Sequence, residues 1–154
     1  MMSTTSSALQ GLAIIAPSMI ATKSRHDFAV ESLRSLRKHA DRTIPLIVMH
    51  DRPPMTGWLP HSLQWVLPAL RWDASAEAIY RDLHVHFVRR SGRGSASALR
   101  DAVVVALERG FEYGFIHLDD HVYSSGFQDL LEYGLIEMRA DPNLLWVRYS
   151  GYPV

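Results

Sequence analysis

Short, uninterrupted apolar runs constrain the fold of this chain more than any other feature. Residues 12–16 are Leu-Ala-Ile-Ile-Ala and are closed by Pro17, and residues 44–49 form a second run that ends in His50-Asp51-Arg52. Residues 85–88 and 113–118 are similar runs that each contain one histidine, and residues 144–147 are Leu-Leu-Trp-Val. Runs of this length without polar alternation are typical of strands buried on both faces of a parallel sheet. We therefore expect about five strands.

Segments with helical periodicity separate these runs. An apolar stripe in residues 24–40 lies opposite basic side chains, and residues 95–107 keep the same spacing before Gly110, where a C-terminal glycine belongs. The stripes consist of Ala29, Leu33, Leu36 and Ala40, opposite Arg34, Arg37 and Lys38; of Leu99, Ala102, Val103, Ala106 and Leu107; and of Phe127, Leu130, Leu131, Leu135 and Met138. The alternating order predicts an α/β fold, a mainly parallel sheet with helices on both faces.

Size and composition fit one globular domain. The chain has 154 residues, 47% of them hydrophobic, and a formal net charge of zero, so no overall field draws it to nucleic acid. Residues 1–10 are rich in Ser and Thr and are expected to be flexible, which leaves residues 11–154 as a single α/β domain. Pro17 and Ser18 interrupt the apolar stretch of residues 11–20. No secretory signal or transmembrane segment is predicted, and the expected location is cytoplasmic.

An acidic cluster follows the predicted strand at residues 113–118. Asp119 and Asp120 are adjacent carboxylates that repel each other, and a divalent cation or a group of hydrogen-bond donors would relieve that cost. His121 adds a nitrogen ligand that suits manganese or another transition ion, whereas oxygen ligands alone suit magnesium. The alternative is that both aspartates begin a turn and cap the next helix. Their position at a strand end favours the site.

Two other predicted strands also end in polar residues. Pro17-Ser18 closes the first strand and Asp51 the second. The carboxyl ends of parallel strands share one edge of the sheet, where open α/β sheets bind ligands. Asp51 is a candidate acceptor for hydrogen bonds from a nucleobase or ribose, and a plain turn residue is the alternative. His117, inside the fourth strand, is expected in the core or the cleft wall.

A glycine-rich basic loop, Arg-Arg-Ser-Gly-Arg-Gly, occupies residues 89–94. Its glycines allow the backbone to approach a diphosphate, and Arg93 or Arg100 can bind phosphate through two hydrogen bonds. The loop is neither a dinucleotide fingerprint nor a Walker loop, since no Gly-Lys-Ser/Thr follows. Arg100 can equally be a solvated surface residue.

In their order and spacing, these pieces resemble the nucleotide-sugar-binding half of a family 2-type glycosyltransferase with the GT-A fold, in the nucleotide-diphospho-sugar transferase superfamily. Residues 12–17 are similar to that family's first strand, which ends in proline, and residues 45–51 to its second, which ends in an aspartate that contacts the base. Residues 94–100 resemble its glycine-to-Ala-Arg-Asn helix start. Residues 112–121 resemble its Gly-Glu-Tyr strand running into Asp-x-Asp.

The resemblance implies a nucleoside diphosphate sugar as ligand and a divalent cation, Mn²⁺ or Mg²⁺, as cofactor. The implied donor-site residues are Pro17, Ser18, Asp51, Arg93, Arg100 and Asp119, with Asp120 and His121 at the metal. The chain departs from the family at His121, which stands where the family has its last acid and usual metal ligand. It also lacks the asparagine that follows the first strand's proline.

The implied activity is transfer of the sugar to an unknown acceptor. The family's acceptor-binding half and catalytic base would lie beyond this chain, so no residue is identified as the base. The alternative is a non-catalytic module that binds a nucleotide or a partner. Exposed apolar surface where the missing half would pack would favour a homo-oligomer. Nucleotidyl transfer on a related fold is disfavoured, because residues 17–20 lack a Gly-rich, Lys-containing loop.

Overall fold

Four parallel strands form the centre of the structure, a computed structural model that describes residues 7–18, 23–52, 78–81, 86–91, 94–119 and 121–144. The strands are β1 (Leu12–Ser18), β2 (Leu46–Arg52), β3 (His86–Ser91) and β4 (Tyr113–Ile116), in the order β3-β2-β1-β4. Residues 12–16 of β1 are all buried, as the uninterrupted apolar run predicts.

The path of the chain through the sheet reverses at β1. From β1 the chain moves outward to β2 and β3, and it then crosses to the opposite side of β1 to form β4. Ile14 is paired with Leu46 of β2 on one side and with Phe115 of β4 on the other. We call the carboxyl ends of β1 and β4 the switch point. In open parallel sheets, ligands bind beyond the strand ends at such a reversal.

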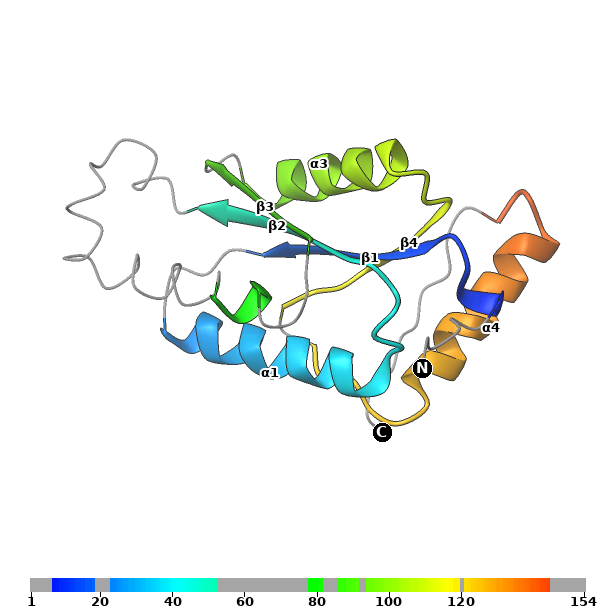
Figure 1. Ribbon diagram of the computed structural model, residues 1–154, viewed down its shortest axis with the longest axis horizontal. Coiled ribbons are helices and arrows are strands. Elements are labelled where there is room, and N and C mark those ends of the chain that lie inside the picture. The colour runs from blue at the N-terminus through cyan, green and yellow to red at the C-terminus, as the bar shows by residue number, and fades with distance from the viewer. Residues whose placement is uncertain are drawn as a thin grey trace.

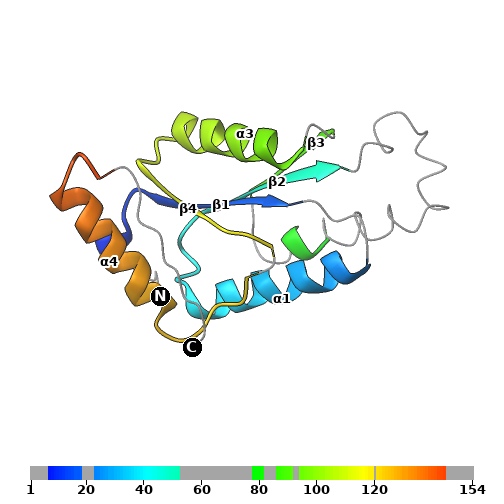
Figure 2. The same ribbon diagram turned by 180° about the vertical axis from the view of Figure 1, so that it is seen from behind.

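Helices cover both faces of the sheet (Figures 1 and 2). Helices α1 (Lys23–His39) and α4 (Phe127–Ala140) lie on one face, and α3 (Ser95–Glu108) lies on the other. Towards α1, the core contains Ala29, Leu33, Leu36, Ile14, Leu46 and Val48. Towards α3, it contains Ala13, Ile15, Ile47, Met49, Ala98, Ala102 and Ala106. The predicted α/β class with helices on both faces is confirmed.

Helix α3 ends just before Gly110, as the sequence analysis predicted. Gly110 has φ +81°, its N–H donates to the carbonyl of Leu107 at 2.9 Å, and the N–H of Phe111 donates to Ala106 at 3.1 Å. These two bonds form a Schellman motif, which favours glycine at the left-handed position. The motif turns the chain directly into β4.

The strands differ in extent from the prediction. About five were expected and four are described; nearly all of the fifth, at residues 144–147, lies outside the described residues. β2 and β3 continue to Arg52 and Ser91, so Asp51 lies inside a strand. The expectation that the fourth strand is buried on both faces is wrong, because Ile116 is 47% exposed. Helix α3 lies over β1 and β2 rather than over β4.

Four predicted side-chain positions also need correction. Arg37, expected on the solvent face of its helix, is only 7% exposed and donates from Nη1 to the carbonyl of Ile44 at 3.1 Å. Burial, with a smaller contribution from Arg42, lowers the pKa of Arg37 below its ordinary value. Leu130, expected on the buried stripe of α4, is 48% exposed. Val103 and Leu107, expected on the apolar stripe of α3, are 37% and 62% exposed.

The amino-terminal segment packs earlier than the predicted domain start at residue 11. Ser7–Leu9 form a short 3-10 helix, and Leu9 is buried in the core. Arg139 of α4 donates to the carbonyls of Ala8 and Gln10 at 2.9 and 2.6 Å. Packed structure therefore begins inside the segment predicted to be flexible. None of the described helices is long and apolar enough to span a membrane.

Candidate functional site at the strand ends

At the switch point, a residue that follows β1 lies beside a residue that follows β4. Arg25 lies in the first turn of α1, which follows β1, and Asp119 lies three residues after the last residue of β4. Nη2 of Arg25 is 3.4 Å from Oδ1 of Asp119, and their side chains are 50% and 14% exposed. The carboxylate is therefore largely enclosed while the guanidinium remains accessible from solvent.

Helix α1 adds to the positive potential at this edge. It begins near the carboxyl ends of the strands and runs back along the sheet (Figure 1). The amino terminus of a helix carries unpaired N–H groups and the positive end of the helix dipole. Both would favour an anionic ligand at this edge of the sheet.

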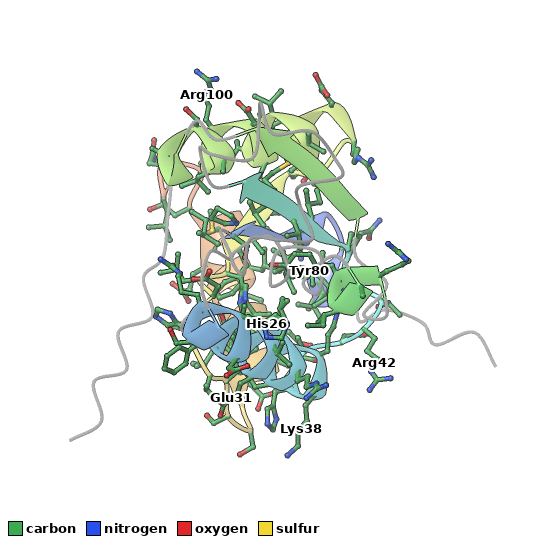
Figure 3. All side chains as sticks on the ribbon, turned by 90° about the vertical axis from the view of Figure 1, so that its left-hand side faces the viewer. His26, Glu31, Lys38, Arg42, Tyr80 and Arg100 are labelled. Atoms are coloured by element: carbon green, nitrogen blue, oxygen red, sulfur yellow. The ribbon has the colours of Figure 1, made fainter. Side chains whose placement is uncertain are left out.

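Ser18, the last residue of β1, is held by a buried tyrosine. Oη of Tyr80 donates to Oγ of Ser18 at 2.6 Å, and the two residues are 1% and 6% exposed. Figure 3, which looks onto the carboxyl ends of the strands, shows Tyr80 between the sheet and α1. The bond fixes the helical residues 78–81 against the end of β1.

His117, directly after β4, is 1% exposed and uses both ring nitrogens. Nδ1 is 2.7 Å from Oη of Tyr123, and Nε2 is 3.4 Å from Oγ of Ser32. Ser32 has one hydroxyl proton, and its partners as a donor are the carbonyls of Leu118 and His121. The Ser32 oxygen is therefore left as the acceptor of a hydrogen bond from Nε2 of His117. This arrangement predicts that the neutral ring of His117 carries its proton on Nε2 and accepts from Tyr123 on Nδ1. The expectation of a core histidine is confirmed.

The segment that carries Asp119 is tied to α1 at several points. Oγ of Ser32 donates to the carbonyl of Leu118 at 3.2 Å and to that of His121, and the N–H of Tyr123 donates to Oγ of Ser35 at 3.0 Å. The ring of Tyr123 packs on Phe127, with centroids 4.3 Å apart. These contacts fix the backbone on both sides of Asp119 relative to α1, and so relative to Arg25.

The other predicted site residues are more dispersed. Pro17 is partly buried within β1 and is paired in register with Met49. Asp51 lies in β2, on the side of β1 away from β4, in register with Arg90. His121 is exposed. Asp120, Arg93 and the side chain of Asp51 lie outside the described part of the chain.

Arg100 is not brought to the switch point. Its guanidinium is 3.1 Å from the carboxylate of neighbouring Asp101, and its side chain is 69% exposed. In Figure 3 it points away from the sheet on the outer face of α3. Among the described side chains, Arg25 rather than Arg100 lies at the switch point, and the sequence interpretation did not include Arg25.

The family resemblance implies a cation at Asp120 and His121, which follow Asp119 directly in the chain. A metal ion bound through Oδ1 of Asp119 would share that oxygen with the guanidinium of Arg25, whereas an ion bound through Oδ2 would not. A divalent ion placed on Oδ1 would face a positive charge within a few ångströms, and like charges at that distance repel. Of the two residues that the resemblance implies at the cation, His121 is exposed and Asp120 lies outside the described residues.

Away from the switch point, a concave surface lies along α1. This open groove, of about 730 Å³, is lined by residues that include His26, Glu31, Arg34, Lys38 and Val122. Acidic and basic side chains alternate in it, so it presents no single charge to a ligand. It is a weaker candidate than the switch point, where the strand topology and an ion pair coincide.

Comparison of the sequence with known families found no matching family model, and a search of curated proteins found no significant match. The geometry of the strand ends is therefore the basis for a functional assignment.

Proposed function

We propose that this domain binds a nucleoside diphosphate sugar at the switch point and acts as a glycosyltransferase-like donor domain. The observation that carries the proposal is the ion pair between Arg25 and Asp119, which joins the connections that follow β1 and β4. A charged pair at the reversal of a parallel sheet lies where such sheets bind nucleotides. The resemblance to the GT-A fold supports the same ligand.

The roles of individual residues follow from their positions. Arg25 and the amino terminus of α1 would receive the diphosphate, the most negative part of the ligand. Asp51, one strand further along the edge, would accept hydrogen bonds from the base or ribose. Asp119 would orient Arg25, and Ser18 with Tyr80 would form the floor beneath the ligand.

Transfer of the sugar to an acceptor is the reaction that the resemblance implies. A base would have to remove a proton from the acceptor hydroxyl. His117 is unsuited to that role, because it is buried and hydrogen-bonded through both ring nitrogens. This observation favours the second candidate function, a domain that binds the nucleotide without turnover.

Calorimetric titration tests the proposal. UDP, GDP and their sugars are added to the full chain, with and without manganese, and Asp119→Asn and Asp120→Ala are compared with the wild type. We expect saturable binding of at least one nucleotide, weakened by both substitutions. Binding of none under either condition would exclude the proposed function. A donor-hydrolysis assay then separates the two candidates: product formation supports the transferase, and binding without product supports the module.

A further inference from the structure

We propose that two copies of this chain associate through the outer face of α3, with the two helices antiparallel and a two-fold axis at Val104. The outer face is formed by Arg100, Val103, Val104, Leu107 and Glu108. It lies on the opposite side of the sheet from α1 (Figures 1 and 2), and the inference is independent of the proposed function.

Helix α3 is apolar on both of its long sides. Ala98, Ala102 and Ala106 are buried towards β1 and β2. On the opposite side, Val104 is 45% exposed and Leu107 is 62% exposed. A helix at the surface of a globular protein normally turns a polar side to water, whereas a helix that is apolar all round is normally covered on both sides. The outer face of α3 therefore has the composition of a contact surface.

The charges on either side of Val104 favour a second copy of the chain as the partner. Arg100, Val104 and Glu108 are spaced by four residues, which places them along one ridge of the helix. Both charged residues are exposed, and Figure 3 shows Arg100 pointing away from the sheet. Because the two charges are opposite and equally far from Val104, a two-fold rotation there brings Arg100 of each copy opposite Glu108 of its partner. A two-fold contact requires a surface that is complementary to itself, and this ridge meets that condition.

The ion pair within each copy is compatible with this contact. The guanidinium of Arg100 is 3.1 Å from the carboxylate of Asp101, and its side chain remains 69% exposed. A guanidinium carries five N–H donors in a planar fork, so it can bind a second carboxylate from the partner at the same time. Asp101 then orients Arg100 towards the interface.

Helix α4 has a comparable apolar ridge that lacks this complementarity. Leu130, Tyr133 and Ile136 are each about half exposed. The residues four positions before and after Tyr133 are Asp129 and Glu137, which are both acidic and exposed. A two-fold contact centred on Tyr133 would place these like charges opposite each other, where they repel. Of the two exposed ridges, only that of α3 is suited to pairing with itself.

Sedimentation equilibrium over a range of protein concentrations tests the pairing. The contact is made by one pair of 14-residue helices, so we expect a weak dimer with a dissociation constant of roughly 10 μM to 1 mM. Arg100→Glu and Glu108→Arg should each weaken association at least about tenfold, because symmetry places the changed charge in the interface twice. The double variant restores opposite charges and should associate within about threefold of the wild type.

Disulfide crosslinking gives a second readout of the same contact. The chain contains no cysteine, so one introduced thiol reports on its own position alone. Val104→Cys places two thiols at the two-fold axis, where a mild oxidant can join them. Leu130→Cys is the matched control, because Leu130 is 48% exposed on α4. We expect Val104→Cys to crosslink at least about tenfold faster, since pairing raises the effective concentration of its thiols. Circular dichroism confirms that each variant is folded.

The outcomes distinguish this interface from the alternatives. A chain that stays monomeric at every concentration would overturn the inference, and so would a dimer that neither charge reversal weakens. Failure of the double variant to recover would overturn the antiparallel arrangement. Crosslinking of Leu130→Cys as fast as that of Val104→Cys would assign the contact to another surface. No nucleotide is present in these experiments, so their results leave the proposed function untouched.

Discussion

The guanidinium of Arg25 lies 3.4 Å from the carboxylate of Asp119, across the point where the path of the chain through the parallel sheet reverses. The two residues are 94 positions apart in the chain; Arg25 follows β1, and Asp119 follows β4, which is the neighbour of β1 at the edge of the sheet. A contact of this kind links the two connections that border the strand ends. Its contribution to folding and its contribution to binding can be measured separately.

The pair should contribute little to stability. Arg25 is half exposed, and exposed ion pairs typically contribute about 0–1 kcal/mol. A double-mutant cycle with Arg25→Met and Asp119→Asn, measured by urea denaturation, should give a coupling free energy below about 1 kcal/mol. A coupling above about 2 kcal/mol would indicate that the pair serves the fold, and would weaken its assignment to ligand binding.

The bond between Tyr80 and Ser18 should contribute measurably to stability. Tyr80→Phe removes the hydroxyl that donates to a buried acceptor, and we expect the free energy of unfolding to fall by about 1–2 kcal/mol. Tyr133→Phe is the matched control, because Tyr133 is 59% exposed and its substitution should change stability by less than about 0.5 kcal/mol. Equal effects of the two substitutions would contradict the buried bond.

The hydrogen bonds of His117 predict a single tautomer. Because Ser32 accepts at Nε2 and Tyr123 donates to Nδ1, the neutral ring should carry its proton on Nε2. Long-range ¹H–¹⁵N correlation spectra distinguish the two nitrogens through their chemical shifts. Tyr123→Phe should shift Nδ1 and lower the free energy of unfolding by about 1–3 kcal/mol. A proton found on Nδ1 in the wild type would show that the network is arranged differently.

Arg37 should be more important for stability than its neighbours on α1. Arg37→Ala removes the donor to the carbonyl of Ile44 and the packing of a buried aliphatic stem, with an expected loss of about 1–3 kcal/mol. Arg34→Ala, at an exposed position of the same helix, should cost less than about 0.5 kcal/mol. Thermal denaturation of both variants compares them, and similar losses would contradict the buried role of Arg37.

Most of the fold could be predicted from the sequence because burial leaves a periodic signal. The apolar run at residues 12–16 predicted a central strand, and the stripe of Ala29, Leu33 and Leu36 predicted the buried face of α1. Gly110 predicted the end of α3. Each of these features depends on local chemistry, which the order of residues records directly.

The candidate site was predicted less completely. The position of Asp119 at a strand end followed from the order of the strands, but Arg25 looked like any arginine at the start of a solvated helix. Its pairing depends on tertiary placement, which no local pattern records. Ser32 did carry a signal: it is fully buried on the apolar stripe of α1, where a polar residue needs a hydrogen-bond partner.

The exposure of β4 could not be predicted for a related reason. The four residues of β4 contain no charged side chain, as in β1, yet Ile116 is 47% exposed. The reason is that α3 lies over β1 and β2 and leaves β4 uncovered. Which strand a helix covers depends on the crossover between strands, and not on the composition of the strand itself.

A ¹H–¹⁵N correlation spectrum recorded during separate titrations with UDP and GDP tests the location of the binding site most directly. We predict that at least one nucleotide shifts the backbone amides of Ser18, Arg25, Leu118 and Asp119, which surround the switch point. The amides of Gly110 and Arg139, at the opposite end of the sheet, should remain unchanged. Shifts confined to that opposite end, or no shifts with either nucleotide, would contradict a nucleotide site at the carboxyl ends of β1 and β4.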